Sequence, residues 1–230
     1  MSRRQRTPLQ RCAAHRWVLC AAAALAACST SPPPPDWRAN AQGAIAHANT
    51  AYLQGNAALA ASEFERARRE IASTGRPDLL ARAELMRCAA HAASLQVEPC
   101  AGFEAVRADA APPERAYAAY LAAEPTAAEA DALPEHHRAV ARAATPEAAL
   151  AAVRGIDDPL ARLVGAAVAL RTRRANPELL TLAVDTASAQ GWRRPLLAWL
   201  GVQAQRAEAA GDSAALAQIR RRMALAGSTP

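Results

Sequence analysis

Alanine dominates this sequence and constrains its fold more than any other feature. It supplies 66 of the 230 residues, and it has the highest helix propensity of the amino acids while burying little surface. Aromatic residues make up only 4% of the chain. Stabilisation must therefore come from many close contacts between helices rather than from a few large side chains. The sequence predicts an all-α fold.

The formal net charge of +6 is concentrated at the N-terminus. Residues 1–27 contain five of the 27 basic residues and no acidic residue, which leaves 22 basic against 21 acidic groups for residues 28–230. A chain so nearly neutral lacks the excess of positive charge on which binding to nucleic acid depends. We therefore expect no nucleic-acid partner.

The N-terminus combines a basic segment, a short apolar run and small residues before a cysteine. The basic segment covers residues 1–16, and the apolar run covers residues 17–27. That run is too short to span a bilayer, and the whole arrangement is typical of a cleaved secretion signal. Its last residues, Leu25-Ala26-Ala27-Cys28, resemble the lipobox of bacterial lipoproteins.

Resemblance to the lipoproteins implies cleavage before Cys28, attachment of diacylglycerol to its thiol and acylation of the new amine. Several acyl chains anchor a protein stably, whereas one chain binds only marginally. Residues 29–35, Ser-Thr-Ser and four prolines, then form an extended polar spacer. Ser29, rather than Asp, after the cysteine implies transfer to the outer membrane. We expect a signal peptide at 1–27, a lipidated tether at 28–37 and a helical domain at 38–230.

Helix start signals recur along the expected helical domain. Thr145-Pro146, Asp158-Pro159 and Asn176-Pro177 each place a capping side chain before a proline at the first helical position. Thr126 and Glu129 have the spacing of a capping box. Together with the breaks between Ala-rich runs, these signals predict about nine or ten helices.

The C-terminal part of the domain repeats itself. Three positions recur after 36 residues: Gly165, Ala175-Asn176 and Gly191 return as Gly201, Gly211-Asp212 and Gly227. A period of this length is typical of stacked helical hairpins.

The first expected hairpin carries a more specific pattern. Small residues and one phenylalanine follow the spacing Ala48, Ala51, Gly55, Ala60, Phe64 and Ala67. This spacing resembles a tetratricopeptide repeat, in which small residues let two helices approach and the phenylalanine fills the gap to the next hairpin. Ala72 stands where that family has proline. The resemblance implies antiparallel hairpins stacked as a repeat array with a concave face. An irregular Ala-rich helical domain is the alternative.

Two cysteines lie within the helical domain. In an oxidising compartment, Cys88 and Cys100 are candidates for a structural disulfide, because residues 97–99 can carry the chain back toward the helix that bears Cys88. Two unpaired buried thiols are the alternative. A redox site is not expected, because the sequence has no Cys-x-x-Cys pair.

The sequence shows no pattern of catalytic or metal-binding residues. Cys88 and His91 are three residues apart and Glu135-His136-His137 form a cluster, but neither has the spacing of a metal site. A Gly-x-Ser-x-Gly elbow, a phosphate-binding Gly-rich loop and a Cys/His nucleophile signature are also missing from the sequence. We expect no enzymatic activity, no metal, no cofactor and no small-molecule substrate.

Charge is distributed unevenly along the domain. Residues 28–157 carry 12 arginines and 16 acidic residues, whereas residues 158–230 carry 10 arginines and 5 acidic residues. Eight arginines of the second part are expected near the ends of neighbouring helices: Arg171, Arg173, Arg174, Arg193, Arg194, Arg220, Arg221 and Arg222. They form a candidate basic edge for an acidic partner. Ordinary solvated arginines are the alternative.

These features predict a lipid-anchored protein on the periplasmic face of the outer membrane, without enzymatic activity, whose helical repeats bind another envelope protein. Resemblance to tetratricopeptide lipoproteins implies a scaffold role in an envelope machine. A peptidoglycan-acting envelope enzyme is the alternative. Such an enzyme would need a catalytic carboxylate in a sugar-sized cleft lined by aromatic residues.

Overall fold

The structure, a computed structural model, describes residues 35–96, 98–124 and 129–228. Within these residues the secondary structure is helical and contains no strand, which confirms the all-α prediction. The expected signal peptide, the lipobox-like residues and residues 28–34 of the expected tether lie outside the described residues. The first described helix begins at Asp36, so the last two residues assigned to the tether belong to it.

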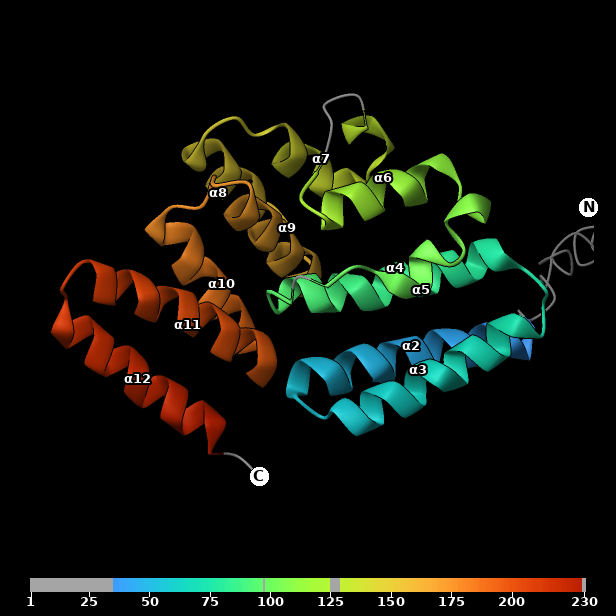
Figure 1. Cartoon of the computed structure of the whole chain (residues 1–230), viewed down its shortest axis with the longest axis horizontal. Helices are drawn as coiled ribbons and strands as arrows, with labels where there is room; N and C mark the ends of the chain where they lie inside the picture. Colours follow the sequence, from blue (N-terminus) through green and yellow to red (C-terminus); the bar gives the residue numbers. More distant parts are fainter. Residues whose placement is uncertain (1–34, 97, 125–128, 229–230) are drawn as a thin grey trace, which may run out of the picture. The chain divides into compact units, whose positions relative to one another are not determined.

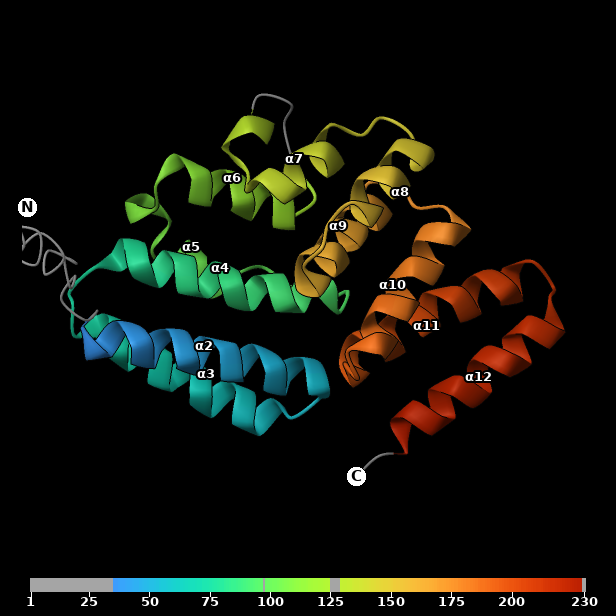
Figure 2. The same cartoon turned by 180° about the vertical axis from the view of Figure 1, so that it is seen from behind.

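The helices vary in length along the chain. Their bounds are α2 (Asp36–Gln54), α3 (Ala57–Ala72), α4 (Pro77–Ala93), α5 (Ala101–Glu104), η2 (Arg107–Asp109), α6 (Pro112–Leu121), η3 (Ala130–Ala132), α7 (Glu135–Arg142), α8 (Pro146–Arg154), α9 (Pro159–Arg171), α10 (Pro177–Ala189), α11 (Arg193–Ala209) and α12 (Ser213–Gly227). Figures 1 and 2 show α2 and α3 as one antiparallel hairpin and α11 and α12 as another. The stretch from α5 to α8 consists of short helices.

The predicted helix starts are confirmed where the structure describes them. Thr145, Asp158 and Asn176 each accept a hydrogen bond from the backbone N–H three residues later, and a proline follows each of them. This satisfies one of the N–H groups that the first turn of a helix leaves unpaired. The expected capping box at Thr126 and Glu129 lies partly outside the described residues.

The 36-residue offset relates the α9–α10 pair to the α11–α12 pair. Gly191 recurs as Gly227, at the end of α12, and Ala175-Asn176 recurs as Gly211-Asp212, in the turn before α12. Gly191 and Gly211 have φ of +65° and +70° and follow the ends of α10 and α11. These φ values favour glycine, because it has no Cβ to clash with the following carbonyl. The other recurring glycines, Gly165 and Gly201, lie inside α9 and α11.

A core of small side chains with a few large ones holds the helices together. Trp199 of α11 is fully buried, and its indole N–H donates to the carbonyl of Ala93 at 3.0 Å, which ties α11 to the end of α4. In the first hairpin, Ala48 and Ala67 pack around Phe64, which is 4% exposed. The small residues let α2 and α3 approach closely, as the repeat-like spacing predicts.

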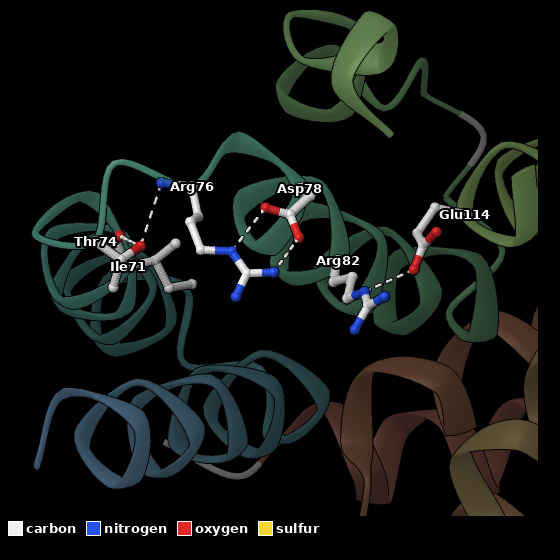
Figure 3. A network of polar contacts seen from close by, with 6 residues as sticks. All are labelled: Ile71, Thr74, Arg76, Asp78, Arg82 and Glu114. Carbon is white, nitrogen blue, oxygen red and sulfur yellow. Dashed lines mark hydrogen bonds and ion pairs between the residues drawn. The ribbon is translucent and has the colours of Figure 1, made fainter. Parts of the chain in front are cut away.

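Polar contacts fix the start of α4, as Figure 3 shows. The Thr74 hydroxyl donates to the carbonyl of Ile71 at 2.6 Å and accepts from the backbone N–H of Arg76 at 3.3 Å. The Arg76 guanidinium donates to both oxygens of Asp78, at 3.2 and 2.6 Å. Further along α4, Arg82 pairs with Glu114 of α6 at 2.6 Å. These contacts connect α4 to the turn before it and to α6.

A disulfide joins α4 to the segment before α5. It pairs Cys88 with Cys100, whose Cα atoms are 6.0 Å apart. The bond brings α5 over Glu84, which lies one helical turn before Cys88 and is fully buried. Because Gly102 has no side chain, α5 can lie directly against the Glu84 carboxylate.

Candidate functional site

A groove lies between α2, α3 and α4, beside the repeat-like hairpin. Its volume is about 260 Å³. Its lining residues are Ala48, Asn49 and Tyr52 from α2, Ala57, Ala60, Ala61, Phe64 and Glu65 from α3, and Arg87 and His91 from α4. We call it the α2–α4 groove. The alanines of α3 follow one another at helical spacing, so one face of that helix offers methyl groups where larger side chains would fill the space.

One wall of the α2–α4 groove is aromatic. The rings of Tyr52 and His91 are stacked, with centroids 4.2 Å apart and planes 6° from parallel. On Tyr52, the Arg194 guanidinium lies 4.4 Å from the ring centroid. Burial lowers the pKa of His91, with a further contribution from Arg87, and burial raises the pKa of Tyr52. The two rings are therefore uncharged at neutral pH, and the charge beside them is that of Arg194, which does not line the groove.

Charged groups also line the groove. The Arg87 guanidinium lies 4.9 Å from the centroid of the Phe64 ring, while Glu65 is exposed. Arg87 also pairs with the buried Glu84 at 3.1 Å, and Arg68 pairs with Glu84 at 3.0 Å. Glu84 thus fixes Arg87 in place, and Arg87 in turn covers Phe64. The groove combines apolar surface with a few fixed polar groups, which is typical of sites that bind a peptide side chain.

Two of the eight candidate partner-binding arginines, Arg171 and Arg174, donate to main-chain carbonyls at the ends of α6 and α7. Arg171 donates to Leu121 and Ala122 at 2.7 Å each, at the end of α6. Arg174 donates to Val140 at 3.1 Å and also to Ala143, both at the end of α7. These carbonyls are the ones that a helix leaves unpaired at its C-terminus. The two side chains therefore serve the fold.

The other candidate arginines lie on three segments. Arg194 donates to the carbonyl of Tyr52 at 2.9 Å, and the side chain of its neighbour Arg193 lies against Gly55. Arg173 is exposed in the turn after α9. Arg220, Arg221 and Arg222 are exposed on α12, where Arg220 pairs with Glu208 at 3.5 Å. The eight side chains thus contact different parts of the fold, and partner binding by them stays a prediction.

The two groups of possible metal ligands, Cys88 with His91 and Glu135-His136-His137, lie in different surroundings. Cys88 is in the disulfide, and His91 stacks on Tyr52. His137 of α7 is 1% exposed, and its Nδ1 lies 3.2 Å from the Tyr120 hydroxyl. Burial lowers the pKa of His137 to about 3, and the neighbouring His136 adds to the shift. In the described part of the chain, no group of three His, Cys, Asp or Glu side chains is placed to hold a metal ion.

Comparisons with known proteins assign neither a family nor a function to this chain. No protein-family model, curated protein or solved structure matches this sequence or this fold. Among the helices of the described residues, none is both long and apolar enough to cross a bilayer.

Sequence reasoning missed the α2–α4 groove and the buried Glu84. A signal for Glu84 was present, because Ala81 and Cys88, three residues before it and four residues after it, lie on the same side of α4. The alanine-rich sequence of α3 could not predict the groove. In sequence, an alanine that lines a groove cannot be distinguished from an alanine that packs against a neighbouring helix.

Proposed function

We propose that this protein is an outer-membrane lipoprotein whose periplasmic helical domain is a scaffold for another envelope protein. The observation that carries the binding part of the proposal is the α2–α4 groove, with its methyl-lined floor, its uncharged aromatic wall and its fixed Arg87. Such a groove suits an apolar peptide side chain flanked by polar main chain.

The anchoring part of the proposal is supported by Leu25-Ala26-Ala27-Cys28 and by the disulfide. Structural disulfides persist in oxidising compartments, which include the bacterial periplasm, and are rare in the cytosol. Cys88 and Cys100 form such a bond in this fold. A lipid at Cys28 followed by a Pro-rich tether would hold the helical domain at the membrane surface while leaving its grooves accessible.

A tetratricopeptide-like arrangement is part of the same proposal. In support, α2 and α3 pack through Ala48, Ala60, Phe64 and Ala67, the positions where the repeat-like spacing falls, and all four are buried. The α9–α10 and α11–α12 pairs follow the 36-residue offset. The short helices between α5 and α8 depart from that pattern, so the proposed repeats are confined to the two ends of the domain.

The alternative, a peptidoglycan-acting enzyme, has less support from the groove. Most glycoside hydrolases place two carboxylates on either side of the scissile bond. The α2–α4 groove offers one carboxylate, Glu65, which is exposed to solvent. Peptide binding needs no such pair.

Site-specific photo-crosslinking in cells tests the scaffold proposal. With a photoreactive residue at Ala61, which is exposed and lines the α2–α4 groove, we expect a discrete adduct with one envelope protein. Ala57→Trp should remove at least about nine-tenths of this adduct, because the indole fills the groove. A loss of this size corresponds to an affinity about tenfold weaker.

Ala58→Trp is the matched control, because Ala58 is the next residue of α3, is also exposed and does not line the groove. It should leave the adduct intact. If no adduct forms from Ala61, or if the two tryptophan variants reduce it equally, the groove is not the scaffold's binding site.

A further inference from the structure

A second groove lies at the C-terminal end of the domain, over α11 and between α10 and α12. Its volume is about 520 Å³. Leu180 of α10, Ala207 of α11, and Ala215 and Ile219 of α12 give it an apolar lining, and Arg206 and Arg222 add two guanidinium groups. We call it the α10–α12 groove. It is separate in its residues from the α2–α4 groove.

The helix on one side of this groove is only partly covered. None of the residues of α12 is fully buried, and Leu225, near its end, is 77% exposed. The Ile219 and Met223 side chains pack against the core from one side. A helix with a half-covered apolar side and an exposed basic side can form one wall of an interface.

The charge of the α10–α12 groove is positive. Arg222 is exposed, and no carboxylate among the described residues lies within ion-pair distance of it. Arg206 is exposed as well and donates one hydrogen bond, to the carbonyl of Ala175 at 3.1 Å. The one carboxylate in the lining, Asp212, accepts from the backbone N–H of Ala215 at 2.9 Å and so caps α12. The acid nearest along α11, Glu208, pairs with Arg220.

We propose that the α10–α12 groove binds an acidic amphipathic helix of the partner protein. The inference rests on the proposed scaffold function and specifies the chemistry of the partner. Apolar residues of such a helix, spaced three and four apart, would lie on Ala207, Ala215 and Ile219, which are half-buried. Its carboxylates would pair with Arg206 and Arg222, whose forked donors match carboxylate oxygens in geometry.

Charge argues against a second copy of this chain as the occupant. A two-fold dimer through this groove would bring the same arginines together, since both subunits use the same surface. The segment 158–230 carries 10 arginines and 5 acidic residues, so the two surfaces would repel one another. The apolar lining likewise suits a protein helix better than a phosphate backbone.

Peptide binding to the full-length lipoprotein in detergent micelles tests the proposal. The probe is a fluorescent 18-residue amphipathic helix with leucine on one face and glutamate on the other, and the comparison peptide has lysine in place of glutamate. We expect the acidic peptide to bind at least about tenfold more tightly than the basic one at low salt, and the difference to shrink as salt screens the charges.

Two charge reversals on α12 provide a matched pair. Arg222→Glu should weaken binding of the acidic peptide about tenfold, whereas Arg221→Glu should change it less than about twofold. Both side chains are exposed and carry the same charge, but only Arg222 lines the groove. The proposal would be overturned if the two variants had equal effects, if the acidic and basic peptides bound with equal affinity, or if neither peptide bound. A dimer of this chain that Arg222→Glu dissociates would overturn it as well. An unchanged helical circular dichroism spectrum shows that both variants fold.

Crosslinking from Ala215, which lines this groove, separates failure of this inference from failure of the scaffold proposal. We expect an adduct with an acidic helical segment of the envelope protein that also crosslinks to Ala61. An adduct from Ala61 without one from Ala215 would leave the scaffold proposal standing and remove this one. No adduct from either position would remove both.

Discussion

Gly102→Ala is expected to lower the free energy of unfolding by about 3 kcal/mol, although alanine is the better helix former. A Cβ at position 102 would lie 2.1 Å from Oε2 of Glu84 and 2.2 Å from its Cδ. The Glu84 side chain cannot move aside cheaply, because it is fully buried and paired with Arg68 and Arg87. Its oxygens receive no well-aligned hydrogen bond from the described residues, so these two ion pairs are what hold it. Urea unfolding followed by circular dichroism measures the change.

Gly201→Ala is the matched control for this substitution. Gly201 also lies inside a helix, α11, but a Cβ there would meet nothing within 4 Å. This variant should gain about 0.5 to 1 kcal/mol from helix propensity alone. In a Glu84→Ala background, Gly102→Ala should cost little, because the clashing carboxylate is gone. Stabilisation by Gly102→Ala in the unaltered chain would contradict the close packing of α5 on Glu84.

Acidification from pH 7.5 to 4.5 is expected to destabilise the protein by about 3 kcal/mol through His137 alone. Burial lowers the pKa of this residue from its ordinary value of 6.5 to about 3, with His136 as a second cause. In this pH window the unfolded chain therefore binds more protons than the folded one, so stability rises with pH. The contribution is complete above pH 6.5 and is lost as the pH falls toward 3.

His137→Gln isolates this effect, because glutamine keeps a polar group beside the Tyr120 hydroxyl but does not titrate. The free energy of unfolding of this variant should fall about 3 kcal/mol less than that of the unaltered chain over the same pH range. If His137→Gln retains the full pH dependence, protonation of another group is responsible.

Local signals in the sequence were sufficient to predict much of the fold. Thr145, Asp158 and Asn176 start helices through contacts with residues three positions away, and such contacts can be recognised without knowing the rest of the structure. The bond between Cys88 and Cys100 spans 12 residues. Over so short a span, the sequence indicates that the chain turns back toward the helix that bears Cys88. The all-α class follows from the alanine content in the same way.

Features that depend on distant segments could not be predicted from the sequence. Arg171 caps carbonyls about 50 residues earlier in the chain, and Arg194 reaches the carbonyl of Tyr52, which is 142 residues away. An exposed arginine and a capping arginine look alike in sequence, because only the packing of other helices decides which carbonyls come within reach. The burial of Glu84 depends likewise on α5 being drawn over it.

The mass of the N-terminal peptide of the protein, purified from membranes, tests the central proposal of a lipid-anchored envelope protein most directly. We expect this peptide to begin at Cys28 and to carry the mass of diacylglycerol on the thiol and an acyl chain on the amine. In Cys28→Ala the chain should stay unprocessed or leave the detergent phase. A peptide that begins at another residue, or a Cys28 that carries no lipid, would contradict the proposal.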